Sequence, residues 1–110
     1  MKIETRIRRE EDRLREIFSG LEPNKLKTVN ALIARAAFIT ISLEDLEVEL
    51  NANGWTEWYE NGRNQSGQKK SAAADAHISL TKNLNAIMKQ MLDLVPPAKA
   101  KSRLEELMGK

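Results

Sequence analysis

Cysteine is absent from this chain, and aromatic residues, histidine and proline are scarce. Without cysteine the chain can form no disulfide bond and offers no thiolate ligand to a metal ion. Aromatic residues make up 5% of the 110 residues, whereas hydrophobic residues as a whole reach 41%, mostly as alanine, leucine, isoleucine and methionine. This composition is typical of a helical domain rather than of a sheet, and the length suits one domain.

Long apolar segments are missing as well. No apolar run approaches the roughly 18 residues of a membrane span, and the N-terminus, MKIETRIRREED, lacks the apolar segment of a signal peptide. We therefore expect a cytoplasmic protein that makes no membrane contact.

The apolar residues that are present repeat at helical spacing. Between Val29 and Leu50, and again between Ala73 and Leu94, stripe positions follow one another three and four residues apart. Two stripes of equal length predict an antiparallel helical hairpin. The predicted fold is all-α: one domain over 1–110, with a shorter N-terminal helix in 1–20, a long hairpin over 24–95 containing a loop at 54–70, and a C-terminal tail or short helix over 96–110.

The apolar face of the second helix is broader than a single partner helix covers. We therefore expect the domain to assemble into an oligomer in which neighbouring subunits cover the surplus. The predicted interface consists of apolar residues in the middle of the two stripes: Leu43, Leu46, Leu50, Leu80, Leu84 and Ile87.

Residue sets that support catalysis are not evident. His77 is the single histidine and lies on an apolar stripe, which favours a core or interface histidine over a pH-sensitive subunit contact. The acidic residues Glu44, Asp45, Glu47 and Glu49 spread around a helix instead of converging on a metal ion. No glycine-rich phosphate loop of the Walker type is present. We expect no catalysis, no metal and no cofactor.

Charge is segregated along the chain although the net charge is only +2. Residues 41–60 hold six acidic residues and no basic one, whereas residues 61–110 hold nine basic and four acidic residues. This separation fits contact with a polyanion or head-to-tail contact between subunits. In the first helix, interleaved acidic residues leave a salt-bridged surface or a subunit contact as alternatives. The cations predicted to contact DNA are Arg6, Arg9, Arg13, Arg63, Lys69 and Lys70.

A polar segment, YENGRNQSGQKKS, occupies Tyr59 to Ser71 between the two long helices. The whole connection is longer than most helix–helix loops, which favours a functional or interface role. Trp55, Trp58 and Tyr59 precede or open this segment. They predict either a hydrophobic plug over the end of the hairpin or a platform on which bases stack.

Residues 37–96 resemble the phage terminase small subunit family. The resemblance is carried by Leu-Glu-Asp-Leu at 43–46, by the loop pattern Tyr-x-Asn-Gly-x-Asn-Gln-x-Gly-x-Lys-Lys-Ser at 59–71, and by Lys-Gln-x-x-Asp-Leu-Val-Pro at 89–96. One departure is that Ser71 is followed by three alanines, where many relatives have proline and an acidic residue.

The resemblance implies a non-catalytic subunit in the cytoplasm of an infected bacterium. Such subunits form homo-oligomeric rings, recognise the packaging site on double-stranded phage DNA, and regulate the ATPase and nuclease of the terminase large subunit. Two other classes stay open: a dimeric helical DNA-binding regulator of transcription, and a structural helical adaptor. In the terminase reading the loop is a fixed recognition element, with positive-φ glycines and with asparagine and glutamine side chains bonded to the backbone. Its motif residues are Tyr59, Asn61, Gly62, Asn64, Gln65, Gly67 and Ser71.

Overall fold

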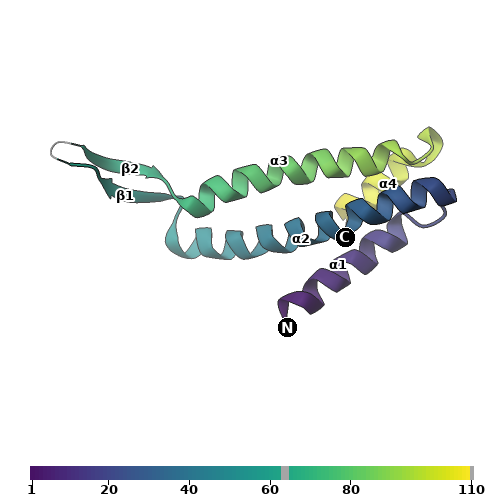
Figure 1. Cartoon of the computed structure of the whole chain (residues 1–110), viewed down its shortest axis with the longest axis horizontal. Coiled ribbons are helices and arrows are strands. Elements are labelled where there is room, and N and C mark those ends of the chain that lie inside the picture. Colours follow the sequence, from purple (N-terminus) through teal and green to yellow (C-terminus); the bar gives the residue numbers. More distant parts are fainter. Residues whose placement is uncertain (63–64, 110) are drawn as a thin grey trace.

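The computed structural model describes residues 1–62 and 65–109, which form four helices and a small two-stranded sheet (Figure 1). The molecule is elongated, with extents of 62 × 31 × 23 Å and a Cα radius of gyration of 17.9 Å. The elements are α1 (Ile3–Ile17), α2 (Pro23–Asn53), β1 (Thr56–Glu60), β2 (Ser66–Lys70), α3 (Ala72–Asp93) and α4 (Pro97–Gly109).

Helices α2 and α3 lie antiparallel along the long axis and form the predicted helical hairpin (Figure 1). Local capping explains their ends. Pro23 occupies the first turn of α2, and the Glu22 carboxylate accepts a hydrogen bond from the Lys25 backbone N–H at 3.0 Å. Gly54 ends α2 with a φ of 87°. The hydroxyl of Ser71 caps α3 by accepting from the Ala74 N–H at 3.1 Å.

The core lies where α1, α2, α3 and α4 meet, at the end of the body away from the sheet (Figure 1). Helix α1 folds back along α2 and reaches Glu44 and Asp45, which accept hydrogen bonds from Arg6. Ile33 and Ala37 of α2 are fully buried within the single chain. The broad apolar face of α2 is therefore covered in large part by α1 on one side and α3 on another. The largest fully buried side chains are Leu14, Phe18, Val29, Ile33, Leu50 and Met91.

The predicted loop at 54–70 is instead an antiparallel β-hairpin, so the all-α prediction holds for the body and is wrong for this segment. Strands β1 and β2 pair in a register that sets Thr56 opposite Lys70 and Glu60 opposite Ser66. The signal was present in the sequence. Thr56, Trp58 and Tyr59 are residue types that favour strands, and Asn61-Gly62 is a strong hairpin-turn pair. The second strand, Ser66–Lys70, is polar throughout and lacks the apolar alternation that usually indicates a strand.

Helix α2 is long and apolar enough, by length and composition alone, to cross a membrane. An 18-residue window within it has a mean hydropathy of 1.4. Such a segment is not expected from the sequence, because no uninterrupted apolar run in the chain is long enough to cross a membrane. A core helix that packs against two neighbours has the same composition, and α2 packs against both α1 and α3.

Candidate functional site: the β-hairpin arm and its base

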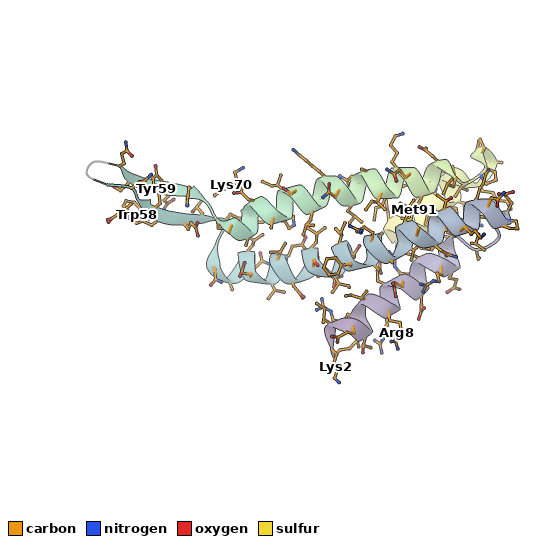
Figure 2. The ribbon with its side chains drawn as sticks, in the orientation of Figure 1. Lys2, Arg8, Trp58, Tyr59, Lys70 and Met91 are labelled. Carbon is orange, nitrogen blue, oxygen red and sulfur yellow. The ribbon has the colours of Figure 1, made fainter. Side chains whose placement is uncertain are left out.

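The two strands form an arm, residues 56–70, that projects beyond the helical body (Figure 2). Alternation along a strand places Trp58 and its partner Gln68 on one face, and Tyr59 with its partner Gly67 on the other. Neither face packs against the body: Trp58 is 63% exposed, and Trp55 and Tyr59 are exposed as well. Trp58 and Tyr59 therefore do not form the predicted hydrophobic plug over the end of the helical hairpin, because their side chains are exposed on the arm. Trp55 is half-exposed and contacts His77 at that end.

Backbone geometry closes the tip of the arm. The Asn61 N–H donates to the Gln65 carbonyl at 2.6 Å, and Gly62 has the predicted positive φ, 80°. For Asn61 and Gln65 the structure records these backbone bonds and not the predicted side-chain bonds. Arg63 and Asn64 lie outside the described residues.

Gly67 differs from its prediction. It has no positive φ and is an ordinary strand residue that faces the Tyr59 ring, where an added Cβ would lie 3.6 Å from Cε1 of Tyr59. That separation is normal van der Waals contact. Of the two loop glycines, only Gly62 is required by its backbone conformation.

The two glycines form a matched pair for mutation. We expect Gly62→Ala to destabilise the paired arm by about 1–2 kcal/mol, because an alanine at this φ places Cβ against the backbone. We expect Gly67→Ala to leave pairing unchanged or to strengthen it. Cross-strand NOEs between residues 59 and 67, with amide exchange of the strand N–H groups, measure the effect. Equal loss of pairing in both variants would contradict the assignment.

A cluster from three elements holds the base of the arm. His77 Nε2 of α3 lies 2.9 Å from Glu47 Oε2 of α2, and the His77 ring meets the Trp55 ring edge-on at a centroid distance of 5.4 Å. The Ser71 N–H donates to the Trp55 carbonyl at 3.0 Å. This cluster fixes where the arm leaves the body. The sequence predicted a core or interface histidine, and the His77 side chain is 19% exposed and contacts Glu47 of the same chain. No local pattern indicates that contact, because the two residues lie 30 positions apart.

The arm's two lysines are both accessible to solvent. Lys69 and Lys70 are 58% and 59% exposed at the side chain, and their nearest carboxylates, Glu57 and Asp75, lie 3.7 and 3.6 Å away. Such long, solvent-exposed pairs contribute little to stability and give way readily to another anion. Arg9 is also exposed, on the first helix.

Arg6 and Arg13 have structural partners instead. Arg6 spans from α1 to α2 and donates to Asp45 at 2.7 Å and to Glu44 at 3.0 Å. Arg13 makes a two-pronged contact with Glu10 at 2.9 Å. The hydrogen bond to Asp45, followed by that to Glu44, raises the pKa of the Arg6 guanidinium above its usual value. The hydrogen bonds to Glu10 raise the pKa of the Arg13 guanidinium in the same way. Arg6 thus links α1 to α2, whereas Arg13 pairs within α1 and reaches the Glu106 carbonyl of α4 at 3.5 Å. Contact of either arginine with DNA would compete with these partners and stays a prediction.

The six predicted interface residues divide into two groups. Leu43, Leu50 and Leu84 are buried within the single chain, so they belong to its own core and are not available to a neighbour. That part of the interface prediction is wrong, because α2 and α3 bury these residues against each other. Leu46, Leu80 and Ile87 are half-buried and keep some apolar surface.

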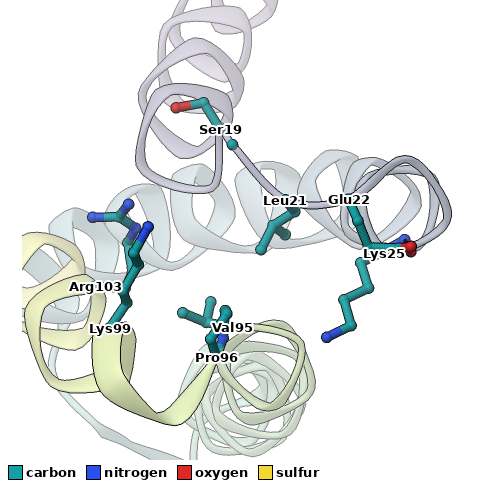
Figure 3. Close-up of a pocket in the computed structure, with 9 residues that line it drawn as sticks. Ser19, Leu21, Glu22, Lys25, Val95, Pro96, Lys99 and Arg103 are labelled. Atoms are coloured by element: carbon teal, nitrogen blue, oxygen red, sulfur yellow. Dashed lines mark hydrogen bonds between the residues drawn. The ribbon is translucent and has the colours of Figure 1, made fainter.

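A small pocket of about 170 Å³ lies at the opposite end of the body, between the α1–α2 turn and the α3–α4 turn (Figure 3). Leu21, Val95 and Pro96 form an apolar floor, while Lys25 approaches from one side and Lys99 and Arg103 from the other (Figure 3). Arg103 is paired with Glu106 at 3.3 Å. Among residues 1–62 and 65–109, no group of three or more His, Asp or Glu side chains is placed to hold a metal ion.

Comparison of the chain with protein-family models, with curated proteins and with solved structures gave no match. A functional proposal therefore rests on the residues and on their geometry.

Proposed function

We propose that this chain is the small subunit of a phage terminase. In this role it is a ring-forming, non-catalytic protein that binds double-stranded viral DNA in the cytoplasm of the infected bacterium. It directs that DNA to the ATPase and nuclease of the large subunit. The resemblance of residues 37–96 to that family supports the proposal, since this stretch coincides with one continuous part of the structure: the second half of α2, the arm and α3.

The observation that carries the proposal is the display of the resembling loop on a projecting arm. Residues 59–71 could have folded against the helices as a spacer, but they extend away from them with lysine, glutamine and aromatic side chains exposed (Figure 2). A two-stranded antiparallel ribbon with cations beside it is one of the elements that proteins use to contact duplex DNA. Lys69 and Lys70 would supply phosphate contacts, and Arg9 a further one.

The test compares two charge-matched variants. Lys69→Ala with Lys70→Ala removes two cations from the arm, and Lys25→Ala with Lys99→Ala removes two cations from the pocket at the other end of the body. Binding to a mixed-sequence DNA duplex is measured across a series of salt concentrations. Each phosphate contact contributes about 0.9 to the slope of log K against log salt, so the arm variant should flatten the slope by about 2 units.

The pocket variant is the control for net charge, since it carries the same total charge as the arm variant. We expect its slope to match that of the unmodified chain. Equal slopes for all three proteins would remove the arm from the DNA contact. Absence of any salt-dependent binding would contradict the DNA-binding function itself.

The exposed aromatic side chains favour a second candidate, a helical adaptor that contacts protein and not nucleic acid. Aromatic residues concentrate at protein–protein interfaces, and most of those in this chain lie in solvent. A helical transcription regulator is the other alternative, and it would be a dimer. Native mass spectrometry separates them: a discrete ring of many subunits supports the terminase proposal, and a dimer supports the regulator.

A further inference from the structure

Four of the five aromatic side chains in this small protein are exposed. Phe18 is 1% exposed, whereas Phe38 is 53% exposed and Trp55, Trp58 and Tyr59 lie in solvent on the arm or at its base. A chain of this size normally buries its aromatic residues, since each removes roughly 150–250 Å² of mostly apolar surface from water. Their exposure on two separate surfaces indicates contacts that a single copy of the chain does not make.

The first surface is an open groove of about 420 Å³ beside Phe38, between α2 and α3. The small side chains of Ala31 and Ala34 leave room along α2 there, and no residue of α1 lines the groove. The polar side chains of Arg35 and Asn83 also line the groove. Its lining residues are Ala31, Ala34, Arg35, Phe38, Ile39, Leu80 and Asn83.

The second surface is the arm. A two-stranded hairpin standing alone in water is at best marginally stable, and both of its outer edges present unpaired backbone groups. Trp58 and Glu60 are two residues apart in β1, so they share one face of the ribbon. A partner that covers this face would remove the exposed tryptophan from water and stabilise the strand pairing.

The two surfaces carry opposite charges at matching places. Arg35 at the groove and Glu60 on the arm are both exposed, and neither has an ion-pair partner among the described residues. The indole N–H of a tryptophan in the groove would find an acceptor in the amide of Asn83. An arginine beside an aromatic ring also adds a cation–π attraction.

The arm does not reach the groove of its own chain. Phe38 lies 15 residues before the end of α2, about 22 Å from the base of the arm at the helical rise, and the arm points the other way (Figure 1). We propose that the arm of one copy lies in the Phe38 groove of a second copy, with Trp58 against Phe38 and Glu60 beside Arg35. This inference rests on the proposed function, because it names the contact through which the ring assembles.

Arm and groove are different surfaces, so the contact is heterologous. Each copy donates an arm to one neighbour and receives an arm from the other, which closes into a ring when the rotation between copies allows it. In this proposal the docked arm forms the centre of the interface. Leu43, Leu50 and Leu84 do not, because they are buried in the core of their own chain.

Charge reversal tests the contact. Arg35→Glu places two carboxylates together at the junction, and Glu60→Arg places two guanidinium groups there. Each variant alone should therefore need an about tenfold higher concentration to assemble. A chain that carries both substitutions, Arg35→Glu with Glu60→Arg, has opposite charges at every junction again and should assemble like the unmodified chain. Sedimentation velocity measures assembly, and the emission of Trp58 in a Trp55→Phe background reports burial of the indole.

A readout besides assembly keeps the inference separate from the proposed function. Each variant is also tested for salt-dependent binding to duplex DNA. If the unmodified chain forms a ring and binds DNA while neither reversal changes assembly, the docking is wrong and the proposed function stands. Loss of assembly in each variant without recovery in the chain that carries both substitutions also overturns the docking. If the reversals change DNA binding and leave assembly unchanged, Arg35 and Glu60 act on DNA and not between copies, and the docking is again wrong. An unmodified chain that neither assembles nor binds DNA contradicts the proposed function.

Discussion

Replacing Phe18 by alanine is expected to destabilise the fold by about 3–5 kcal/mol, the usual cost of emptying a buried phenylalanine site. Phe18 follows α1 and is 1% exposed within the core where the helices meet. Domains of this size are stable by roughly 5–15 kcal/mol in total, so the loss is a large share of the whole. The measurement is the free energy of unfolding from urea titration followed by far-UV circular dichroism.

The chain supplies its own control for that substitution. Phe38→Ala removes the same side chain from a position that is 53% exposed, and in dilute solution it should change the free energy of unfolding by about 0.5 kcal/mol or less. The comparison must be made below the concentration at which copies associate, because Phe38 contributes to the proposed docking groove. If the two substitutions lowered stability equally, the core would not be where the structure places it.

Shortening the arm is expected to abolish assembly and to leave the helical body folded. The design removes Glu57–Lys69 and joins Thr56 to Lys70, its partner in the strand register, through Asn-Gly, the preferred two-residue hairpin turn. The Trp55–Ser71 hydrogen bond, the Glu47–His77 contact and the Trp55 ring against His77 are all retained. Since the removed residues contribute nothing to the buried core, thermal unfolding should be nearly unchanged.

The readouts for this variant are thermal unfolding by circular dichroism, oligomeric state by native mass spectrometry, and DNA binding. We expect an unchanged melting curve, a monomer and weak DNA binding. A ring that persists without the arm would show that the half-buried residues Leu46, Leu80 and Ile87 are sufficient for assembly. A large drop in melting temperature would show that the arm belongs to the folding unit. The Lys25→Ala, Lys99→Ala variant is the control with an intact arm.

Together the two experiments separate what holds the molecule together from what it does. The Phe18 substitution tests packing at the end of the body where α1 and α4 meet the helical hairpin of α2 and α3. The arm tests the contacts made at the other end (Figure 1). Stability and assembly should therefore respond to different substitutions, which a chain whose arm were part of the core would not show.

Much of the helical framework was predictable from local sequence. The apolar stripes, Pro23, Gly54 and Ser71 set the ends of α2 and α3 within about a residue, because caps and periodicity act over a few neighbouring positions. The C-terminal segment also forms the helix that was expected there, α4. The β-hairpin turn also has a local signal in the sequence, since the pair Asn61-Gly62 favours such a turn.

Only the tertiary structure decided which partner each side chain meets. Arg6 reaches Asp45, 39 residues away, and becomes a tie between helices, whereas sequence reasoning assigned it to DNA. The return of α1 along α2 decided that Ile33 is core while Phe38 stays exposed. Glu47, Trp55 and His77 meet only because α2, the α2–β1 turn and α3 converge. The physical reason is common to all of them: helix ends depend on neighbours in sequence, but ion pairs, exposure and grooves depend on elements brought together by folding.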